Sequence, residues 1–410
     1  MNIRIIFCST LMTAAFAACS QMDENEAAWQ GGGNVGVGLN SDVEVRLSVG
    51  GLSTRASIES KTDSFAVDSL GIYMLATDII GVNPQEVAPI NWLDIRCNKM
   101  DNVATNAIWD SGTRTTSLVW ADPTASYWYP YENWYAFRFY GYYPRVSDSE
   151  VNRENRRMTA TYTELDGTTD IIWGQSLRSN QSDEYDKYRY SAKYFRQAGY
   201  SDKLPNLAFE HKLMRIQFYI QGVADNNYPA NPYEMANKMV LDSVVMYARH
   251  SGMAAGEWDS IPTTADLIVA DLDTPSNEGT IRFNWNGDRS PIPMFDENDT
   301  PYLSKKQVHN DSLIKVGQPI LLPVPDEDEV PGFLYGAKVY LRLADGQSQI
   351  KFYDAAPLDL NLNANTAEYQ AGHTYKVVIN ISGPQKVTLK ATLTPWEEVD
   401  EEGFDNLDLN

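Results

Sequence analysis

Cysteine is scarce in this chain, which has only three, at positions 8, 19 and 97. Cys8 lies inside the apolar N-terminal segment and Cys19 directly follows that segment, so Cys97 has no partner in the remainder of the chain. No internal disulfide can form there, and stability must come from hydrophobic cores. We predict that Cys97 is a small, buried or half-buried residue rather than a reactive thiol.

Histidine is also scarce, and the motifs of common catalytic and cofactor sites are missing. The four histidines, at positions 211, 250, 309 and 373, do not have the spacing of metal ligands on a helix. No nucleophile elbow, phosphate-binding loop or dinucleotide fingerprint occurs between a strand and a helix. The sequence therefore predicts a protein that is not an enzyme and that carries no cofactor and no metal.

Positive charge is outweighed by negative charge, because 33 lysines and arginines stand against 55 acids, giving a formal net charge of −22. Such a surplus of acid repels phosphate backbones, so nucleic acid is not expected as a partner. Seven of the acids lie between Glu397 and Asp408, where no base occurs. We expect this stretch to be a solvated tail.

Long apolar runs are limited to the N-terminus, where Arg4 precedes an apolar stretch from Ile5 to Ala18. The stretch is too short to cross a bilayer permanently and is typical of an export signal. Small or apolar residues stand directly before Cys19, as in a bacterial lipobox. We predict a signal peptide at 1–18, cleavage after Ala18 and a lipid on Cys19, with an ordinary secretory signal as the alternative. The acidic residues that follow resemble a tag for the outer membrane.

The rest of the chain is long enough for at least two domains. Residues 19–41 include a polar, glycine-rich run and are predicted to be a flexible tether. A polar stretch from Gln175 to Asn206 separates two regions of higher apolar content. We therefore predict an N-terminal domain at 42–205 and a C-terminal domain at 206–410 that includes the acidic tail.

Alternation of apolar and polar residues with a period of two dominates both regions and is typical of strands buried on one face. Helical periodicity occurs only in short stretches near 187–197 and 233–238. The pattern predicts an all-β chain built from β-sandwiches, with little helix. The clearest alternating segments are residues 43–49, 135–143, 214–220, 375–381 and 387–393.

Aromatic residues are concentrated between positions 109 and 134, and two interpretations are open. Flat exposed rings could form a stacking platform for sugars, while buried rings would fill a sandwich core or an interface between domains. Alternation favours packing for most of them. The residues concerned are Trp109, Trp120, Tyr127, Trp128, Tyr129, Tyr131 and Trp134.

Seven short segments, taken in order, resemble the signature segments of the fimbrillin family, the type V pilins and related surface lipoproteins. Together with the lipobox they span nearly the whole chain. The segments are Thr54-Arg55-Ala56, Val67 to Tyr73, Phe139 to Pro144, Asp170 to Gly174, Leu207 to Leu213, Ala371 to Tyr375 and Thr394-Pro395-Trp396.

The resemblance implies two transthyretin-like β-sandwich domains in tandem and a lipid-anchored protein of the outer membrane. It also implies assembly with other fimbrial subunits, identical or paralogous, and adhesion to a host or bacterial surface ligand. In the family, an Arg-specific protease removes the N-terminal strand, and a donor strand of the next subunit fills the groove. The alternative function is a cell-surface glycan-binding lipoprotein that serves nutrient uptake.

We assign the cleavage site, the removable strand and the donor strand to named residues. Cleavage after Arg55, which follows Gly50-Gly51, would release the first strand whole, whereas cleavage after the alternative Arg46 would split it. The removable strand carries Val43, Val45, Leu47 and Val49. The donor candidate runs from Lys386 and carries Val387, Leu389, Ala391 and Leu393, with closure of its own domain as the other interpretation.

Overall fold

The computed structural model describes the parts of the chain that form its strands, short helices and many of the loops between them. The described residues are 43–49, 67–80, 87–110, 115–131, 134–176, 190–196, 204–249, 253–254, 257–295, 306–310, 312–324, 334–343, 351–354, 358–359, 369–383 and 386–395. Strands make up most of them, and α2 (Ala192–Phe195) is the single α-helix among them. The predicted all-β class is confirmed.

Seven strands in the N-terminal half close on themselves into a ring. Every neighbouring pair is antiparallel except β9 and β1, which run parallel. Apolar side chains of all seven strands meet in one core inside this ring. The order is β1 (Ser48–Val49), β4 (Thr115–Trp120), β3 (Asn98–Asp110), β2 (Val67–Ile79), β5 (Tyr135–Tyr143), β8 (Ile172–Ser176) and β9 (Asn206–His211).

Two sheets in the C-terminal half share a second core, as expected for a β-sandwich. The first sheet has the order β18 (Ile314–Leu322), β10 (Met214–Gly222), β22 (His373–Gly383) and β23 (Lys386–Pro395). The second has the order β16 (Ile292–Pro293), β11 (Met239–Arg249), β19 (Leu334–Leu343) and β20 (Lys351–Asp354), with β17 (Lys306–Gln307) on β11 and β21 (Leu358–Asp359) on β19.

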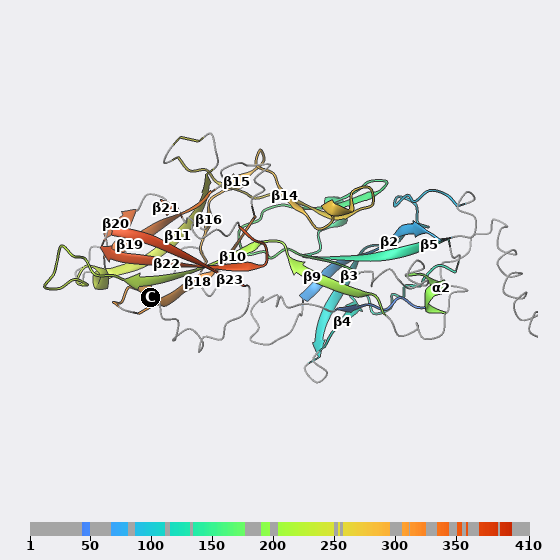
Figure 1. The fold of residues 1–410 in the computed structure, drawn as a ribbon, viewed down its shortest axis with the longest axis horizontal. Helices are drawn as coiled ribbons and strands as arrows, with labels where there is room; N and C mark the ends of the chain where they lie inside the picture. The colour runs from blue at the N-terminus through green and yellow to red at the C-terminus, as the bar shows by residue number, and fades with distance from the viewer. Residues whose placement is uncertain are drawn as a thin grey trace, which may run out of the picture.

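A further sheet joins strands that are far apart in sequence. It has the order β14 (Ile281–Phe283), β13 (Ala265–Asp271), β7 (Arg157–Tyr162) and β6 (Val151–Arg153), and its apolar residues belong to the N-terminal core. In Figure 1 the ring strands lie at one end of an elongated molecule, β18 to β23 lie at the other, and β14 lies between them. The remaining elements are β12 (Ile261–Pro262), paired with β15 (Arg289–Ser290), and the 3-10 helices at 148–150, 236–238 and 275–277.

Two features cross residue 205, where the sequence places the domain boundary. β9 begins at Asn206 but pairs with β8 and β1 of the ring, and the next strand, β10, pairs with β18 and β22. β13 and β14 also lie beyond residue 205 and pack with the N-terminal core. The division into 42–205 and 206–410 remains a prediction.

In β5, more side chains are buried than the alternation of apolar and polar residues predicts. Phe137 and Phe139 point into the ring as expected, yet Tyr140 and Tyr142 on the other face are also fully buried. The Tyr140 hydroxyl donates a hydrogen bond of 2.8 Å to Glu278, in the turn that follows β13. The sheet containing β13 therefore covers the second face of β5, which no local pattern in the sequence records.

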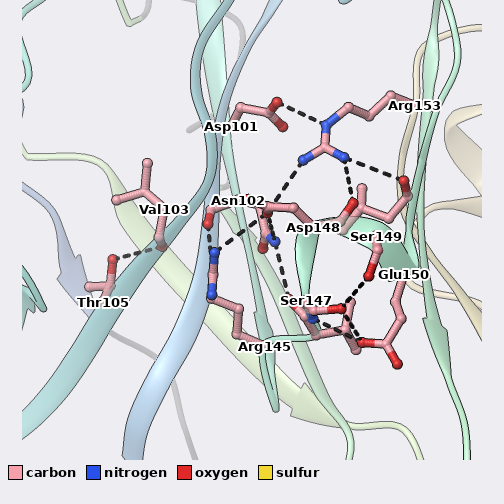
Figure 2. Close-up of polar contacts among 12 residues, drawn as sticks. Asp101, Asn102, Val103, Thr105, Arg145, Ser147, Asp148, Ser149, Glu150 and Arg153 are labelled. Atoms are coloured by element: carbon pink, nitrogen blue, oxygen red, sulfur yellow. Dashed lines mark hydrogen bonds and ion pairs between the residues drawn. The ribbon is translucent and has the colours of Figure 1, made fainter.

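A polar cluster fixes the corner that follows β5 (Figure 2). The Arg145 Nε–H donates to the Asn102 carbonyl at 2.8 Å, and the Asn102 amide donates to Asp148 at the same distance. Arg153 donates to Asp101, also at 2.8 Å. Asn102 has a φ of 51°, a backbone conformation that asparagine tolerates better than most residues. These contacts are structural, since they hold β3 against the turn that leads to β6.

Within the described residues, none of the helices is long and apolar enough to cross a bilayer.

Candidate functional site

The first described segment, residues 43–49, is held to the ring by backbone hydrogen bonds on two sides. On one side the Val45 N–H donates to the Tyr127 carbonyl at 2.8 Å, and the Tyr129 N–H donates to the Val43 carbonyl at 3.1 Å. On the other side the Ser48 N–H donates to the Pro205 carbonyl at 2.9 Å. The segment thus lies between residues 127–129 and the start of β9.

The side chains of this segment divide between the core and the surface by strict alternation. Val45 is 1% exposed and Leu47 is 8% exposed, and both belong to the N-terminal core. Val43 and Val49 are half-buried against the same core. Burial of side chains of this size is worth roughly 1.5–3 kcal/mol each. The segment therefore supplies apolar groups to a core that the rest of the ring builds.

The closing strand β1 is very short. Ser48 pairs with Ser117 of β4 on one side and with Asn206 of β9 on the other, and Val49 pairs with Leu207. By contrast, β2 and β3 are 13 residues long and pair along much of their length. The ring is thus closed at β1 by two residues, which bridge β4 and β9.

A cavity of about 400 Å³ lies beside this segment. Three of its lining residues, Val43, Glu44 and Arg46, belong to the segment itself. Its other walls combine aromatic, aliphatic and charged groups. They are Trp128, Tyr129, Phe195, Arg196 and Leu204.

The aromatic residues between 109 and 134 differ in burial and in their contacts. Tyr129 is 1% exposed, and its ring packs on Phe139 and on Phe195, with centroids 6.2 and 4.8 Å apart. Burial raises the pKa of the Tyr129 hydroxyl well above its usual range. Trp128 is half-buried and lines the cavity, whereas Trp134 is 41% exposed. Packing therefore explains Tyr129, and Trp128 keeps an accessible surface at the cavity.

The remaining aromatics of this stretch also make specific contacts. Trp120 and Tyr127 meet edge to face with their centroids 5.0 Å apart. The Arg196 guanidinium lies over the Tyr131 ring, 4.6 Å from its centroid. The side chain of Trp109 lies outside the described part of the chain.

Two of the motif segments found in the sequence lie side by side in the ring. β8 and β9 pair so that Ile172 faces His211 and Gly174 faces Phe209. Just before β8, Asp170 lies 2.7 Å from the His211 imidazole, and both side chains are buried. Gly372 of a third segment donates its N–H to the Leu213 carbonyl at 2.9 Å. These motif segments thus lie where the chain passes from the ring to the C-terminal sheets.

Several predicted site residues lie outside the described residues, namely Ala18, Cys19 and Arg55. The alternative cleavage residue, Arg46, is exposed on the first segment between Val45 and Leu47. Cys97 is buried, as predicted. Among the described residues, no group of three or more histidine, cysteine and acidic side chains could hold a metal ion.

The donor candidate is β23, which is paired with β22 of its own chain from Lys386 to Pro395. Val387 is buried and Leu389 packs partly against the C-terminal core. This is the arrangement of a strand that closes its own sheet at one edge. A donor role for residues 387–393 remains a prediction.

Sequence reasoning missed three residues at this site. Phe195, Arg196 and Leu204 line the cavity but lie in or beside the polar stretch that was expected to separate two domains. The only local signal is the short helix α2, whose N-cap Ser191 accepts a hydrogen bond from the Tyr194 N–H at 3.3 Å. Nothing in the sequence shows that these residues line the same cavity as residues 43–46.

No protein-family model matches the chain, and no curated protein matches its sequence. Solved structures similar to it include a fimbrial protein from Bacteroides vulgatus, with 12% identity, a TM-score of 0.47, and coverage of 86% of this chain and 99% of the other. The fimbrial anchor protein Mfa2 from Porphyromonas gingivalis has 11% identity, a TM-score of 0.30, and coverage of 86% and 97%.

A C-terminally truncated form of the tip fimbrial protein Mfa3 from the same organism has 10% identity, a TM-score of 0.33, and coverage of 86% and 100%. Fimbrial proteins are thus among the structures similar to this chain.

Proposed function

We propose that this chain is a fimbrial subunit or accessory protein that assembles with identical or paralogous subunits by donor-strand exchange and mediates adhesion. In this proposal the chain is held at the outer membrane through a lipid on Cys19. The observation that supports it best is the position of β1, the short strand that closes the ring between β4 and β9.

Release of residues 43–49 would have two consequences. Val45 and Leu47 would leave the N-terminal core, and β4 and β9 would lose the strand between them. A sheet edge with unpaired backbone groups beside an apolar groove binds an incoming strand that restores both kinds of contact. This arrangement supports the proposal that one strand of another subunit replaces the chain's own.

The proposed cleavage after Arg55 is tested by treating the purified chain with an Arg-specific protease. We expect the wild-type chain and the Arg46→Ala variant to form oligomers after treatment, and the Arg55→Ala variant to stay monomeric. Size-exclusion chromatography with light scattering measures the outcome. Oligomers in all three samples without protease, or in none of them with protease, would refute donor-strand exchange in this chain.

The proposed anchor is tested separately by labelling cells with a radioactive fatty acid. We expect label on the wild-type chain and none on the Cys19→Ser variant. Label on both variants would assign the lipid to another residue, and label on neither would support an ordinary secretory signal.

A further inference from the structure

The first C-terminal sheet, whose strands are labelled in Figure 1, differs in charge from the chain as a whole. Its four strands, β18, β10, β22 and β23, contain no aspartate or glutamate, although the chain has 55 acids among 410 residues. The second sheet of the sandwich is mixed, since β11, β20 and β21 each contain an aspartate. The basic residues of the first sheet are Arg215, Lys315, Lys376, Lys386 and Lys390.

Three of these basic residues share the outer face of the sheet. Arg215 and Tyr219 alternate along β10 with residues of the C-terminal core. Tyr219 is paired with Lys315 of β18, and Lys376 of β22 is paired with Gln217 of β10. The Lys376 ammonium lies over the Tyr219 ring, 4.6 Å from its centroid. Because directly opposed residues lie on one face of a sheet, the three basic residues present positive charge on the same side.

This outer face is partly shielded from solvent. Lys315 is exposed, while Arg215, Tyr219 and Lys376 are half-buried. Partial burial lowers the pKa of the Lys376 ammonium. A negative charge beside the ammonium would offset this loss of solvation. An anionic segment lying on the face would therefore be stabilised there.

We propose that residues 397–402 bind this outer face of their own chain and hold β23 in its sheet. A carboxylate binds a guanidinium such as that of Arg215 through paired, charge-assisted hydrogen bonds, and binds each lysine as a point charge. In this proposal the acidic tail is bound rather than solvated. Residues 397–402 contain no base and five acids, which are Glu397, Glu398, Asp400, Glu401 and Glu402.

The position of β23 puts these acids within reach of the face. Thr394, near the end of β23, is paired with Thr374 of β22, which is in turn paired with Arg215 of β10. Neighbouring strands are about 4.8 Å apart, so Arg215 lies about 10 Å from β23. An extended chain covers about 3.3 Å per residue, so residues 396–402 can cross both strands. Attachment to β23 also gives the acids an effective concentration on the order of millimolar.

A second acidic run, Asp326 to Glu329, is the competing occupant within the chain. It follows β18, whose last residue, Leu322, is paired with Met214 at the same end of the sheet. The residues between β18 and β19 must link the two sheets of the sandwich, whereas residues 397–402 follow an edge strand of the basic sheet itself. These connections favour the C-terminal acids.

Docking of the tail would oppose the departure of β23. A segment that crosses β22 and contacts β10 must detach before β23 can leave its place at the edge of the sheet. For the donor role of β23, the docked tail would delay strand exchange. This consequence alone rests on the proposed function.

Carbodiimide cross-linking tests the docking on the chain from residue 20 onward, without protease. The reagent joins a carboxylate to an amine that lies in contact with it. We expect cross-linked peptides in the monomer that join Lys376 or Lys315 to residues 397–402. Cross-links found only in dimers would assign the contact to a second copy of the chain. That result, cross-links only to residues 326–329, or none to either lysine would overturn the proposal.

Hydrogen exchange of the β23 amides supplies the second measurement. Removal of residues 397–410 should speed this exchange about threefold to tenfold, and Lys376→Gln about twofold or more. Both effects should shrink at about 1 M salt. Lys338→Gln is the matched control, because Lys338 of β19 is also half-buried, 5.2 Å from the centroid of the Tyr340 ring, but belongs to the second sheet.

Two results of the exchange measurement would contradict the proposal. They are equal effects of the two lysine substitutions and an unchanged rate after removal of residues 397–410. Neither cross-linking nor exchange depends on cleavage after Arg55 or on polymer formation. A failure of donor-strand exchange would therefore leave both results as expected.

Discussion

At the scale of single residues, Trp173 of the ring contacts the sheet that contains β13. Its indole N–H donates to the Val269 carbonyl at 2.9 Å, and its ring lies against the backbone at Gly279. Gly279 has a φ of 73°, and an added Cβ would overlap the Trp173 ring. Both the backbone conformation and the close approach therefore require glycine at this position.

A pair of glycine substitutions separates these two effects. Gly372 has a similar φ of 68°, but a Cβ added there would lie 3.9 Å from its nearest neighbour, in ordinary contact. Gly372→Ala should lower the free energy of unfolding by about 1–2 kcal/mol, the cost of a left-handed backbone. Gly279→Ala should cost about 1–3 kcal/mol more, because it adds steric overlap. Denaturant unfolding measures both values, and equal losses would show that the Trp173 contact is not tight.

Glu278 makes the stability of the folded chain depend on pH. Burial raises the pKa of the Glu278 carboxyl, although hydrogen bonding to Tyr140 and the charge of Arg138 act in the opposite direction. A carboxyl whose pKa is higher in the folded chain stabilises that chain fully below its ordinary pKa of 4.5. The contribution is lost as pH rises through the folded value.

The variant Glu278→Gln should therefore lack this contribution. We expect the unfolding free energy of the wild type, minus that of the variant, to fall as the pH rises from about 4.5, the ordinary value, toward neutrality. Parallel urea titrations across this interval measure the difference. A difference that stays constant or grows with pH would contradict the effect of burial at Glu278.

At the scale of elements, the segment 43–49 combines backbone hydrogen bonds on two sides with two buried apolar side chains, Val45 and Leu47. Both kinds of contact attach the segment to the ring. Alternation in the sequence predicted which of its residues face the core. The same pattern could not predict its two flanking partners, residues 127–129 and Pro205, because pairing between distant segments leaves no local signal.

Substitution of Leu47 tests the importance of these side chains. Leu47→Ala should lower the unfolding free energy by about 2–3 kcal/mol, because it leaves a cavity in the core. Arg46→Ala, at the exposed neighbouring position, should change it by less than about 0.5 kcal/mol. Chemical denaturation of both variants gives the comparison. Equal effects would show that the segment packs only loosely on the ring.

The role of β23 is tested with a synthetic peptide of residues 386–395. We expect the peptide to bind the chain after release of its first strand, since Val387, Leu389, Ala391 and Leu393 alternate as the released side chains do. A scrambled peptide of the same composition is the control. Fluorescence anisotropy of labelled peptides measures binding. Equal affinity for cleaved and intact chain would argue that β23 only closes its own sheet.

At the scale of the whole molecule, composition and periodicity predicted the all-β class. They could not predict that strands beyond residue 205 pack against the N-terminal half. β13 follows residue 205 by 60 positions, yet it covers β5 through Tyr140 and Glu278. Likewise, Arg196 lines the same cavity as residues of the first strand, although it lies in a polar stretch whose sequence resembles a linker. Both arrangements depend on tertiary packing rather than on local pattern.

Sequencing the N-terminus of the protein taken from the cell surface tests the central claim most directly. If the first strand is removed so that another subunit can fill its place in the ring, the surface form should begin at Ala56. A surface form that still begins at Cys19 and carries residues 43–49 would contradict the account.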